Sequence, residues 1–382
     1  MKKDITATRK HKQLSKGKTA RNQIRRMAKQ QRLTIGLDLG DRHSCYCILN
    51  EAGETVSEGQ LPTTQAGLSW LLGKMCASRV AVEVGTHSPW VSRHIAGLGH
   101  EVIVANPHKV KLITQSVRKN DRVDAQQLAR LARVDPKLLS PIRHRGEEAQ
   151  ADLAVIRARA ALVEARTSLI NCARGTAKPL GERLKKCDAE QVKEGLGDGL
   201  SEAVRTAIGP ILKSVEAISE QIAAYDEKIE EIAKRYPEVE LLTPVYGVGT
   251  LIALTYILTI EDAQRFAHSR DVGAFLGMRP KQRDSGERQP QLGISKNGDR
   301  VLRSLLVQAA HCMLRKGAPD SDLRAWGLGK LESGGKNGKR RTLVGVARKI
   351  GVLLHRLWVS GEVYDPLYQR KAVAGKAKRK AA

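Results

Sequence analysis

The spacing of apolar residues changes twice along this chain of 382 residues, and each change limits what the segment can fold into. Up to about residue 133, apolar runs of strand length alternate with amphipathic runs of helix length. From about 147 to 235 the strand signals vanish, and apolar residues recur every three or four positions, as in long helices. A third, helical pattern begins near Leu241. For a chain of this length, these changes predict two or three domains.

The first pattern predicts an α/β domain over residues 33–146. It opens with three strands in an antiparallel meander, because tight turns separate the runs LTIGLDL, HSCYCILN and TVSEGQ. The elements expected after the meander are a helix near 65–75, a strand at 79–85, a helix after Pro89, a strand at 101–106 and an amphipathic helix at 121–134.

The segment 147–236 carries an apolar seam with heptad-like spacing. Its second half has apolar residues four and three positions apart: Ile211, Val215, Ile218, Ile222, Tyr225, Ile229 and Ile232. Its first half follows the same rhythm at Leu153, Ile156, Ala160, Val163 and Ile170. Two such helices pair within a chain or between protomers. We expect an antiparallel α-helical coiled-coil arm that supports a dimer, with a simple intramolecular hairpin as the alternative.

Residues 237–369 are predicted to form a mainly α-helical domain. In TPVYGVGTLIALTYIL, a GVG turn between two apolar segments resembles a helix-hairpin-helix, whose backbone N–H groups can bind a phosphate. A turn that serves packing alone explains it equally well. The stretch RPKQRDSGERQPQLGISKNGDRVLR that follows is basic, rich in glycine and poor in apolar residues. Functional residues concentrate in loops of this kind.

The charge of the chain points to nucleic acid. The formal net charge is +26, and residues 1–32 hold twelve Lys and Arg against Asp4 alone. Residues 370–382 hold six basic residues and no acid. We expect both ends to be flexible basic tails that bind phosphate backbones. The alternative is that they only increase solubility.

Several other classes of protein do not fit the sequence. The six cysteines are scattered, without the spacing of a zinc site or a disulfide framework, as is typical of reduced core residues. The basic N-terminus lacks the apolar run of a secretory signal. The longest mostly apolar stretch, 245–260, is too short to span a membrane. We therefore expect a soluble cytoplasmic protein of a bacterium or archaeon, associated with the nucleoid.

Four acidic residues of the first domain occupy unusual positions. Asp38 lies within a strongly apolar strand and Glu83 within VAVEVG, where a carboxylate is costly unless it has a cation or a hydrogen-bond partner. Asp121 and Asp124 stand three positions apart at the start of a helix and so share a face. Each also has a structural interpretation, above all Asp121 as a helix N-cap.

Taken together, the four carboxylates on a meander plus α/β segment form an RNase H-like arrangement. Convergent hard oxygen ligands can hold two Mg²⁺ ions about 3.5 to 4 Å apart and assist phosphoryl transfer. A competing interpretation exists, because IGLDLG with a hairpin also resembles the first phosphate loop of actin-like ATPases and sugar kinases. Those proteins need a second phosphate loop in a repeated domain half, and the sequence contains no such repeat.

The residues now quoted resemble the DEDD transposases of insertion sequences, whose relatives include the Piv-type DNA invertases. The resemblance covers nearly everything from residue 33 to about 368. It is carried in the first domain by GLDLGDRHSCYCILNEAGE, VEVGTHSPWVSRHIAGLGHEVIVANPHKVK and KNDRVDAQQLARL, and in the last by LLTPVYGVGTLIA and AFLGMRPKQRDSGERQPQLGISKNGDRVLRSLLVQAAH. It implies a RuvC-like catalytic domain and a C-terminal domain bearing a serine nucleophile.

Carried over by position, the resemblance implies that four carboxylates bind Mg²⁺ and are catalytic: Asp38, Glu83, Asp121 and Asp124. The serine that best matches the nucleophile is Ser285 in RDSGE, and Ser295 in GISKNGD is its rival. Gly286 would allow close approach of a DNA backbone. The chain departs from the family at Asp284, where a second serine is common.

The resemblance and the charge also predict the partners. Six basic residues near these motifs are expected to bind nucleic acid: Arg118, Lys119, Arg122, Arg283, Arg288 and Lys296. The resemblance implies a structured guide RNA, encoded in the element, that pairs with target and donor DNA. It also implies a homodimer or homotetramer.

The sequence thus predicts a transposase or site-specific recombinase that cuts and rejoins DNA through a serine–DNA intermediate. Two alternatives remain open. A metal-dependent hydrolytic nuclease of the Holliday-junction resolvase type would form no adduct and would not depend on Ser285. A non-catalytic nucleic-acid-binding relic would keep all its properties after Asp124→Asn.

Overall fold

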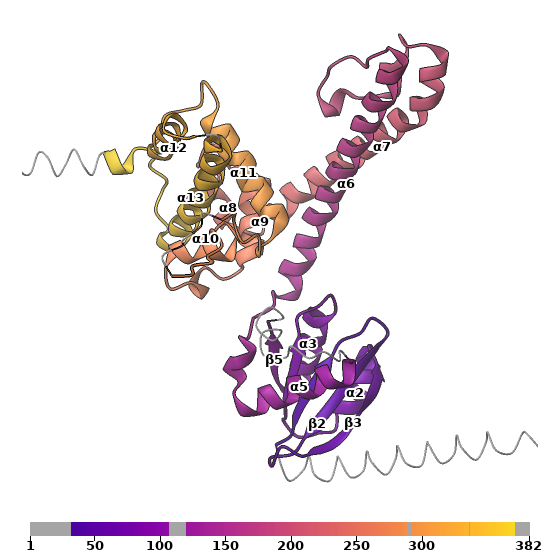
Figure 1. Ribbon diagram of the computed structural model, residues 1–382, viewed down its shortest axis with the longest axis vertical. Coiled ribbons are helices and arrows are strands. Elements are labelled where there is room, and N and C mark those ends of the chain that lie inside the picture. Colours follow the sequence, from indigo (N-terminus) through magenta and orange to yellow (C-terminus); the bar gives the residue numbers. More distant parts are fainter. Residues whose placement is uncertain are drawn as a thin grey trace, which may run out of the picture. The chain divides into compact units, whose positions relative to one another are not determined.

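The computed structural model describes residues 32–106, 120–286, 288, 290, 292–335 and 337–370, and the predicted basic tails lie almost entirely outside them. The chain divides into two compact units, one ending at Glu147 and the other beginning at Glu148 (Figure 1). Each unit has its own core. The domain boundaries expected from the sequence within the second unit stay predictions, because the arm and the C-terminal helices share one apolar core there.

The first unit is built on a mixed five-stranded sheet of order β3-β2-β1-β4-β5. The strands are β1 (Thr34–Asp38), β2 (His43–Leu49), β3 (Thr55–Pro62), β4 (Arg79–Glu83) and β5 (Glu101–Ala105). β1, β2 and β3 pair antiparallel, as the predicted meander requires, and β4 and β5 add parallel to β1. The strands lie where the apolar runs predicted them.

Helices cover both faces of this sheet. They are α2 (Gln65–Leu72), α3 (Ser88–Gly97) and α5 (Asp121–Val134). Leu37 and Val82 point to the face that packs against α2 and α3, whereas Ala81 points to the face covered by α5. A Cβ on Gly36 would collide with the carbonyl oxygen of Ala125, so α5 lies directly on the backbone of β1. This arrangement is consistent with the predicted RNase H-like fold.

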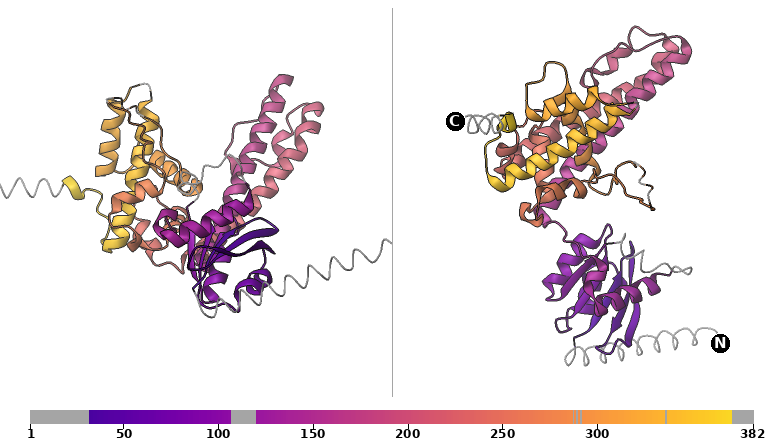
Figure 2. Two further views of the ribbon diagram at one scale, coloured as in Figure 1. Left: turned by 60° about the horizontal axis from the view of Figure 1, so that its bottom comes forward. Right: turned by 60° about the vertical axis from the view of Figure 1, so that its left-hand side comes forward.

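The second unit begins with two long helices, α6 (Glu147–Ala177) and α7 (Glu202–Ala233), which run side by side in all views (Figures 1 and 2). They are antiparallel, since Arg159 pairs with Asp226 while the later Arg166 meets the earlier Ser219. The predicted seam lies between them: all seven apolar residues chosen on α7 are buried or half-buried. The helices therefore pair within the chain, and the dimer they were expected to support stays a prediction.

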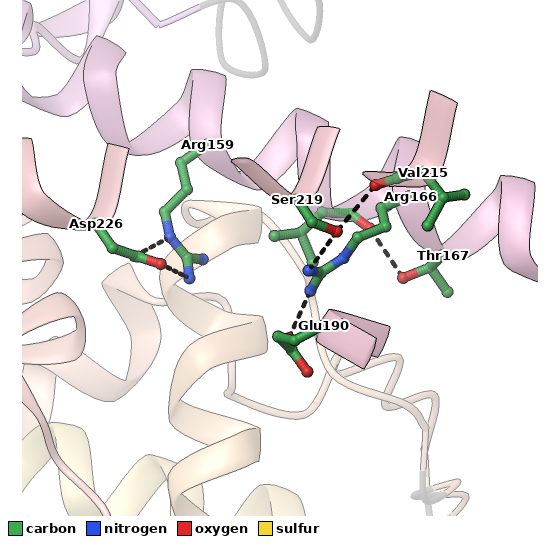
Figure 3. A network of polar contacts seen from close by, with 8 residues as sticks. Arg159, Arg166, Thr167, Glu190, Val215, Ser219 and Asp226 are labelled. Carbon is green, nitrogen blue, oxygen red and sulfur yellow. Dashed lines mark hydrogen bonds and ion pairs between the residues drawn. The ribbon is translucent and has the colours of Figure 1, made fainter. Parts of the chain in front are cut away.

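Polar contacts cross the middle of this helix pair (Figure 3). Arg159 binds Asp226 with two hydrogen bonds of 2.5 and 3.1 Å. Two helical turns further along α6, the buried side chain of Arg166 donates to Ser219 Oγ at 3.3 Å and to Glu190 Oε1 at 2.8 Å. Ser219 in turn donates to the carbonyl of Val215. A charged side chain thus interrupts the apolar contact between α6 and α7.

A bundle of helices completes the second unit. Its members are α8 (Glu238–Leu242), α9 (Thr250–Ile260), α10 (Val272–Phe275), α11 (Arg300–Leu314), α12 (Asp322–Glu332) and α13 (Gly338–Ser360). The apolar α9 is buried along its length, and Tyr256 on it donates a 2.6 Å hydrogen bond to the carbonyl of Gly351 on α13. Among the residues that the structure describes, no helix has the length and apolar character needed to cross a bilayer.

The GVG turn connects α8 to α9. Gly247 has a φ of +86°, which favours glycine, and a Cβ there would lie 2.9 Å from the carbonyl oxygen of Ala309 on α11. Gly249 is the N-cap of α9. The turn therefore has a packing role against α11, and its phosphate-binding role stays a prediction.

Candidate active site

Asp38 and Glu83 end two neighbouring strands of the first unit. β1 and β4 are parallel, with Leu37 opposite Val82, so the next residue of each strand occupies the adjacent position in register. Both are half-buried. Because side chains alternate across a strand, Asp38 points to the same face as Gly36 and Glu83 to the same face as Ala81. That face is the one covered by α5.

Asp121 and Asp124 lie in the first turn of α5, but neither caps it. The N-cap is Asn120, whose side chain accepts a 3.1 Å hydrogen bond from the N–H of Arg122. The interpretation of Asp121 as an N-cap is therefore wrong, because the amide one position earlier already satisfies that backbone group. Asp121 is exposed and Asp124 half-buried.

The direction of α5 brings its first turn to the ends of β1 and β4. Arg79, the first residue of β4, donates a 3.0 Å hydrogen bond to the carbonyl of Ala132 near the end of α5. The start of β4 thus meets the last turns of α5, so the helix runs antiparallel to the strand. Its first residues consequently lie toward Glu83. All four predicted carboxylates share one end and one face of the sheet.

This donor set has the chemistry that a divalent cation prefers. Carboxylate oxygens are hard ligands suited to Mg²⁺, and four of them carry more negative charge than a single ion needs. In the described part of the chain, however, no three His, Cys, Asp or Glu side chains form a group that could hold a metal ion. The residue types fit the ion, while their side chains are not gathered into a closed site.

A histidine network that the sequence did not reveal adjoins the end of β4. Ser88 Oγ lies 2.9 Å from His144 Nε2 and donates to the carbonyl of Gly85 at 2.8 Å. Burial, and then the neighbouring arginines, lower the pKa of His144. Nearby, His87 lies 3.2 Å from Asp41 and accepts a hydrogen bond from Trp90. Ser88 and His144 are 56 positions apart, so no local pattern could have joined them.

Ser285 lies in the second unit, at the tip of a two-stranded ribbon. The N–H and the carbonyl of Ser285 both bond to Arg288, which closes a tight turn, and Gly286 within it has a φ of +57°. Lower rungs join Lys281 to Gly293 and Ser295 to Arg279. We call the described residues from 279 to 295, which leave out 287, 289 and 291, the serine ribbon. Ser285 is exposed, as its predicted role requires.

Ser295, the rival nucleophile, is half-buried at the base of the same ribbon. Its N–H donates to the carbonyl of Arg279 at 2.9 Å. The next residue, Lys296, has a φ of +60°, which is uncommon for a residue with a side chain. The two serines therefore differ in exposure and in position, one at the tip and one at the base.

The basic residues expected to bind nucleic acid are distributed over both units. Arg118 and Lys119 lie outside the described residues. Arg122 is 61% exposed and only 4.0 Å from Glu58. Arg283 and Arg288 are exposed on the serine ribbon beside Ser285.

Comparison with known proteins places this architecture in a class. Residues 35–178 match a transposase family named for a DEDD motif and for IS110, and residues 239–325 match the transposase family IS116/IS110/IS902. The first match covers the four carboxylates, and the second covers the serine ribbon. Both define a transposase of insertion sequences.

Individual relatives agree with the family matches. The transposase for insertion sequence element IS1111A of Coxiella burnetii is 28% identical over 86% of this chain and 90% of its own length. That for IS1328 of Yersinia enterocolitica is 27% identical over 74% of this chain and 84% of its own length. A probable family 20 transposase of Pseudomonas aeruginosa is 28% identical over 66% of this chain and 76% of its own. This chain belongs to the DEDD-type transposases of the IS110 family and is an enzyme of that class.

Proposed function

We propose that this protein moves an insertion sequence by cutting and rejoining DNA through a covalent bond between Ser285 and a DNA phosphate. The observation that carries the proposal is the pairing of two features: four carboxylates at one end of an RNase H-like sheet, and an exposed serine at the tip of a basic ribbon.

The chemistry is a transesterification. Ser285 Oγ attacks a DNA phosphorus, loses its proton to solvent or a base, and displaces a deoxyribose oxygen, which leaves as a hydroxyl after taking up a proton. The new serine–DNA phosphodiester conserves the energy of the broken bond. A second DNA hydroxyl can then attack it and restore the serine, so strands are exchanged without ATP.

Asp38, Glu83, Asp121 and Asp124 would hold Mg²⁺ for this reaction. When bound, the ion stabilises negative charge on the phosphate and on the leaving oxygen. Serine is a weak nucleophile at neutral pH and needs such help. Arg283 and Arg288 flank the serine and would bind the phosphate through their guanidinium groups.

The same proposal includes the nucleic-acid partners and the assembly. Lys296 and Arg122, with Arg118 and Lys119, would neutralise backbone phosphates. The net charge of +26 suits a protein that binds DNA together with a structured guide RNA. We propose a homodimer or homotetramer as the active form, in which α6 and α7 contribute to the contact between protomers.

A denaturing gel tests the proposal. End-labelled DNA that spans the element ends is incubated with Mg²⁺, RNA transcribed from the element and the protein. We expect a slow-migrating band that protease removes, present with wild type and Ser295→Ala. It should be absent with Ser285→Ala and Asp124→Ala, because one loses the nucleophile and the other a metal ligand.

Other outcomes separate the alternatives. Cleaved DNA with free 5′-phosphate ends and no adduct, unaffected by either serine substitution, would identify a hydrolytic nuclease. An adduct that Ser295→Ala abolishes and Ser285→Ala retains would move the nucleophile to the base of the ribbon. Full activity without Mg²⁺ and with Asp124→Ala would remove the carboxylates from the mechanism.

A further inference from the structure

We propose that Arg303 is the positioning residue of the serine ribbon, holding its base closed so that Ser285 is presented in one place. The inference rests on the proposed role of Ser285. Arg303 lies on α11 and is half-buried. Its Nη1 donates to the carbonyl of Leu276, before the ribbon, and to that of Gly298, after it, both at 3.1 Å. One guanidinium thus joins the two strands where they leave the bundle.

The base is too narrow for side chains. A Cβ on Gly277, which has a φ of +69°, would lie 2.6 Å from the backbone nitrogen of Asn297. A Cβ on Gly298 would collide with the backbone of Phe275 and Leu276. Lys296 donates its N–H to the carbonyl of Gly277 at 2.9 Å while held in a left-handed conformation. Such backbone strain persists only where the surroundings enforce it, and Arg303 is among the groups that do so.

The helix that carries Arg303 is itself fixed. Leu302 and Leu306 on α11 are fully buried in the bundle core. Asp299 caps α11 by accepting a 2.9 Å hydrogen bond from the N–H of Leu302, and it also accepts one of 3.0 Å from Arg157 on α6. Through its two hydrogen bonds, Arg303 therefore connects the base of the ribbon to a helix that is fixed in the bundle.

A small opening at the base would displace the tip substantially. At the rise of an extended strand, the six residues from Arg279 to Ser285 span at most about 20 Å, so a rotation of about 10° at the base moves the serine by up to roughly 3 Å. A misplacement of about 1 Å can lower the rate of a reaction by about 100-fold. The positioning of Ser285 is consequently sensitive to contacts far from it in sequence.

The test uses Arg303→Met, which keeps the aliphatic stem and removes both hydrogen bonds. Arg300→Met is the matched control: Arg300 lies one turn earlier on α11, forms an ion pair with Glu164, and has 79% of its side chain exposed. Arg303→Lys restores a donor near the two carbonyls. Each full-length variant is assayed for amide hydrogen exchange, for DNA affinity and for the rate of adduct formation at saturating DNA.

For Arg303→Met we expect exchange at Lys281, Ser295 and Lys296 to rise about tenfold while the amides of α11 keep their protection. DNA affinity should change less than about twofold, and adduct formation should slow at least about tenfold. Arg303→Lys should recover part of both losses, and Arg300→Met should resemble wild type. The readouts separate positioning from unfolding, since unfolding would expose α11 as well.

Three results would overturn the inference. Unchanged exchange in the ribbon would show that Arg303 does not hold its base. Faster exchange with a wild-type adduct rate would show that the base does not position the serine. An adduct that persists in Ser285→Ala would refute the proposed nucleophile and the catalytic part of this inference, whereas the exchange result would still report on the ribbon.

Discussion

His100 is held in its neutral form by two backbone groups. Its Nδ1 accepts from the N–H of Ser78, and its Nε2 lies 3.2 Å from the carbonyl of Leu72, to which it donates. The residue is 6% exposed. A proton on Nδ1 would face another N–H, and burial lowers the pKa of His100. The pKa of His144 is lowered in the same direction.

The first unit should therefore lose stability in mild acid. In the unfolded chain these histidines titrate near 6.5, so below that pH the unfolded state binds more protons than the folded one. Above about pH 6.5 both states are neutral at these histidines, and the free energy of unfolding is unaffected by them. As the pH falls below that value, the free energy of unfolding decreases by at most about 1.4 kcal/mol per pH unit for each histidine. This loss of stability is measured by urea titrations of the full chain at pH 7, 6 and 5, with hydrogen exchange in the strands of the first unit as the readout.

Substitution of His100 tests whether this residue causes the pH dependence. His100→Gln should flatten the pH dependence, while His43→Gln, at an exposed position on the same sheet, should leave it unchanged. If the slope is the same in His100→Gln as in wild type, His100 is not the source.

Among single residues, the sequence indicates those whose polarity does not match the segment around them. Asp38 and Glu83 stood out because carboxylates are costly in apolar strands. Asn120 as the cap of α5, and Ser88 with His144, could not be found, because amides and hydroxyls are common at helix starts and their partners are set by the fold. Arg303 gave no signal, since one arginine among many basic residues does not reveal that it binds two carbonyls.

The pair of helices α6 and α7 contains a buried charge whose removal should not weaken it. The side chain of Arg166 is 7% exposed, whereas that of its partner Glu190 is 70% exposed. Its Nε has no hydrogen-bond partner among the described residues. Burying a charge costs free energy that a solvent-exposed partner only partly offsets.

We therefore expect Arg166→Met to leave the free energy of unfolding of the second unit unchanged or to raise it by about 1 kcal/mol. Ser219 keeps its bond to Val215, and Glu190 stays hydrated, so nothing buried loses its partner. Asp152→Ala is the contrast: it leaves Arg235 and the half-buried hydroxyl of Tyr236 without their shared carboxylate, and it should destabilise. Guanidinium titration compares them, and a loss above about 2 kcal/mol in Arg166→Met would contradict the expectation.

Element prediction succeeded where apolar periodicity is strong. The five strands and the seam of α7 follow from it, because burial of one face dictates both. The serine ribbon did not, since its residues are polar on both sides and only the hydrogen bonds of the folded state give it form. The sequence indicated a basic loop there. In the structure, hydrogen bonds close this loop into a ribbon, with Ser295 at its base and Ser285 at its tip.

The carboxylates belong to the first unit and both candidate nucleophiles to the second. The mechanism that we propose therefore requires two units to meet. We predict that they come from different protomers. Equal amounts of Asp124→Ala and Ser285→Ala, each inactive alone, should then regain about one quarter of the wild-type adduct, because half the dimers are mixed and each mixed dimer has one intact pair.

The control is a mixture of Asp124→Ala and Asp38→Ala. Both changes lie in the first unit, so no exchange of units can assemble an intact site. Failure of the first mixture to form adduct would place the complete site within one chain. The division between the two units near residue 147 coincides with a change in apolar periodicity, and the finer domain boundaries stay predictions. The assembly could not be predicted, because no apolar pattern in the sequence identifies which protomer would contact a given surface.

The contact between Gly36 and Ala125 has a consequence for inheritance. Every base change at the first or second position of a glycine codon replaces the residue or ends the chain, and any replacement here would push α5 off β1 and carry Asp121 and Asp124 away from Asp38. If the four carboxylates act as we propose, a single nucleotide change in the element's own gene would immobilise the element. Copies that carry a replacement, and not a stop codon, would still encode the second unit with its serine ribbon. By our proposal, their product would compete with that of the active copies for the same nucleic acid.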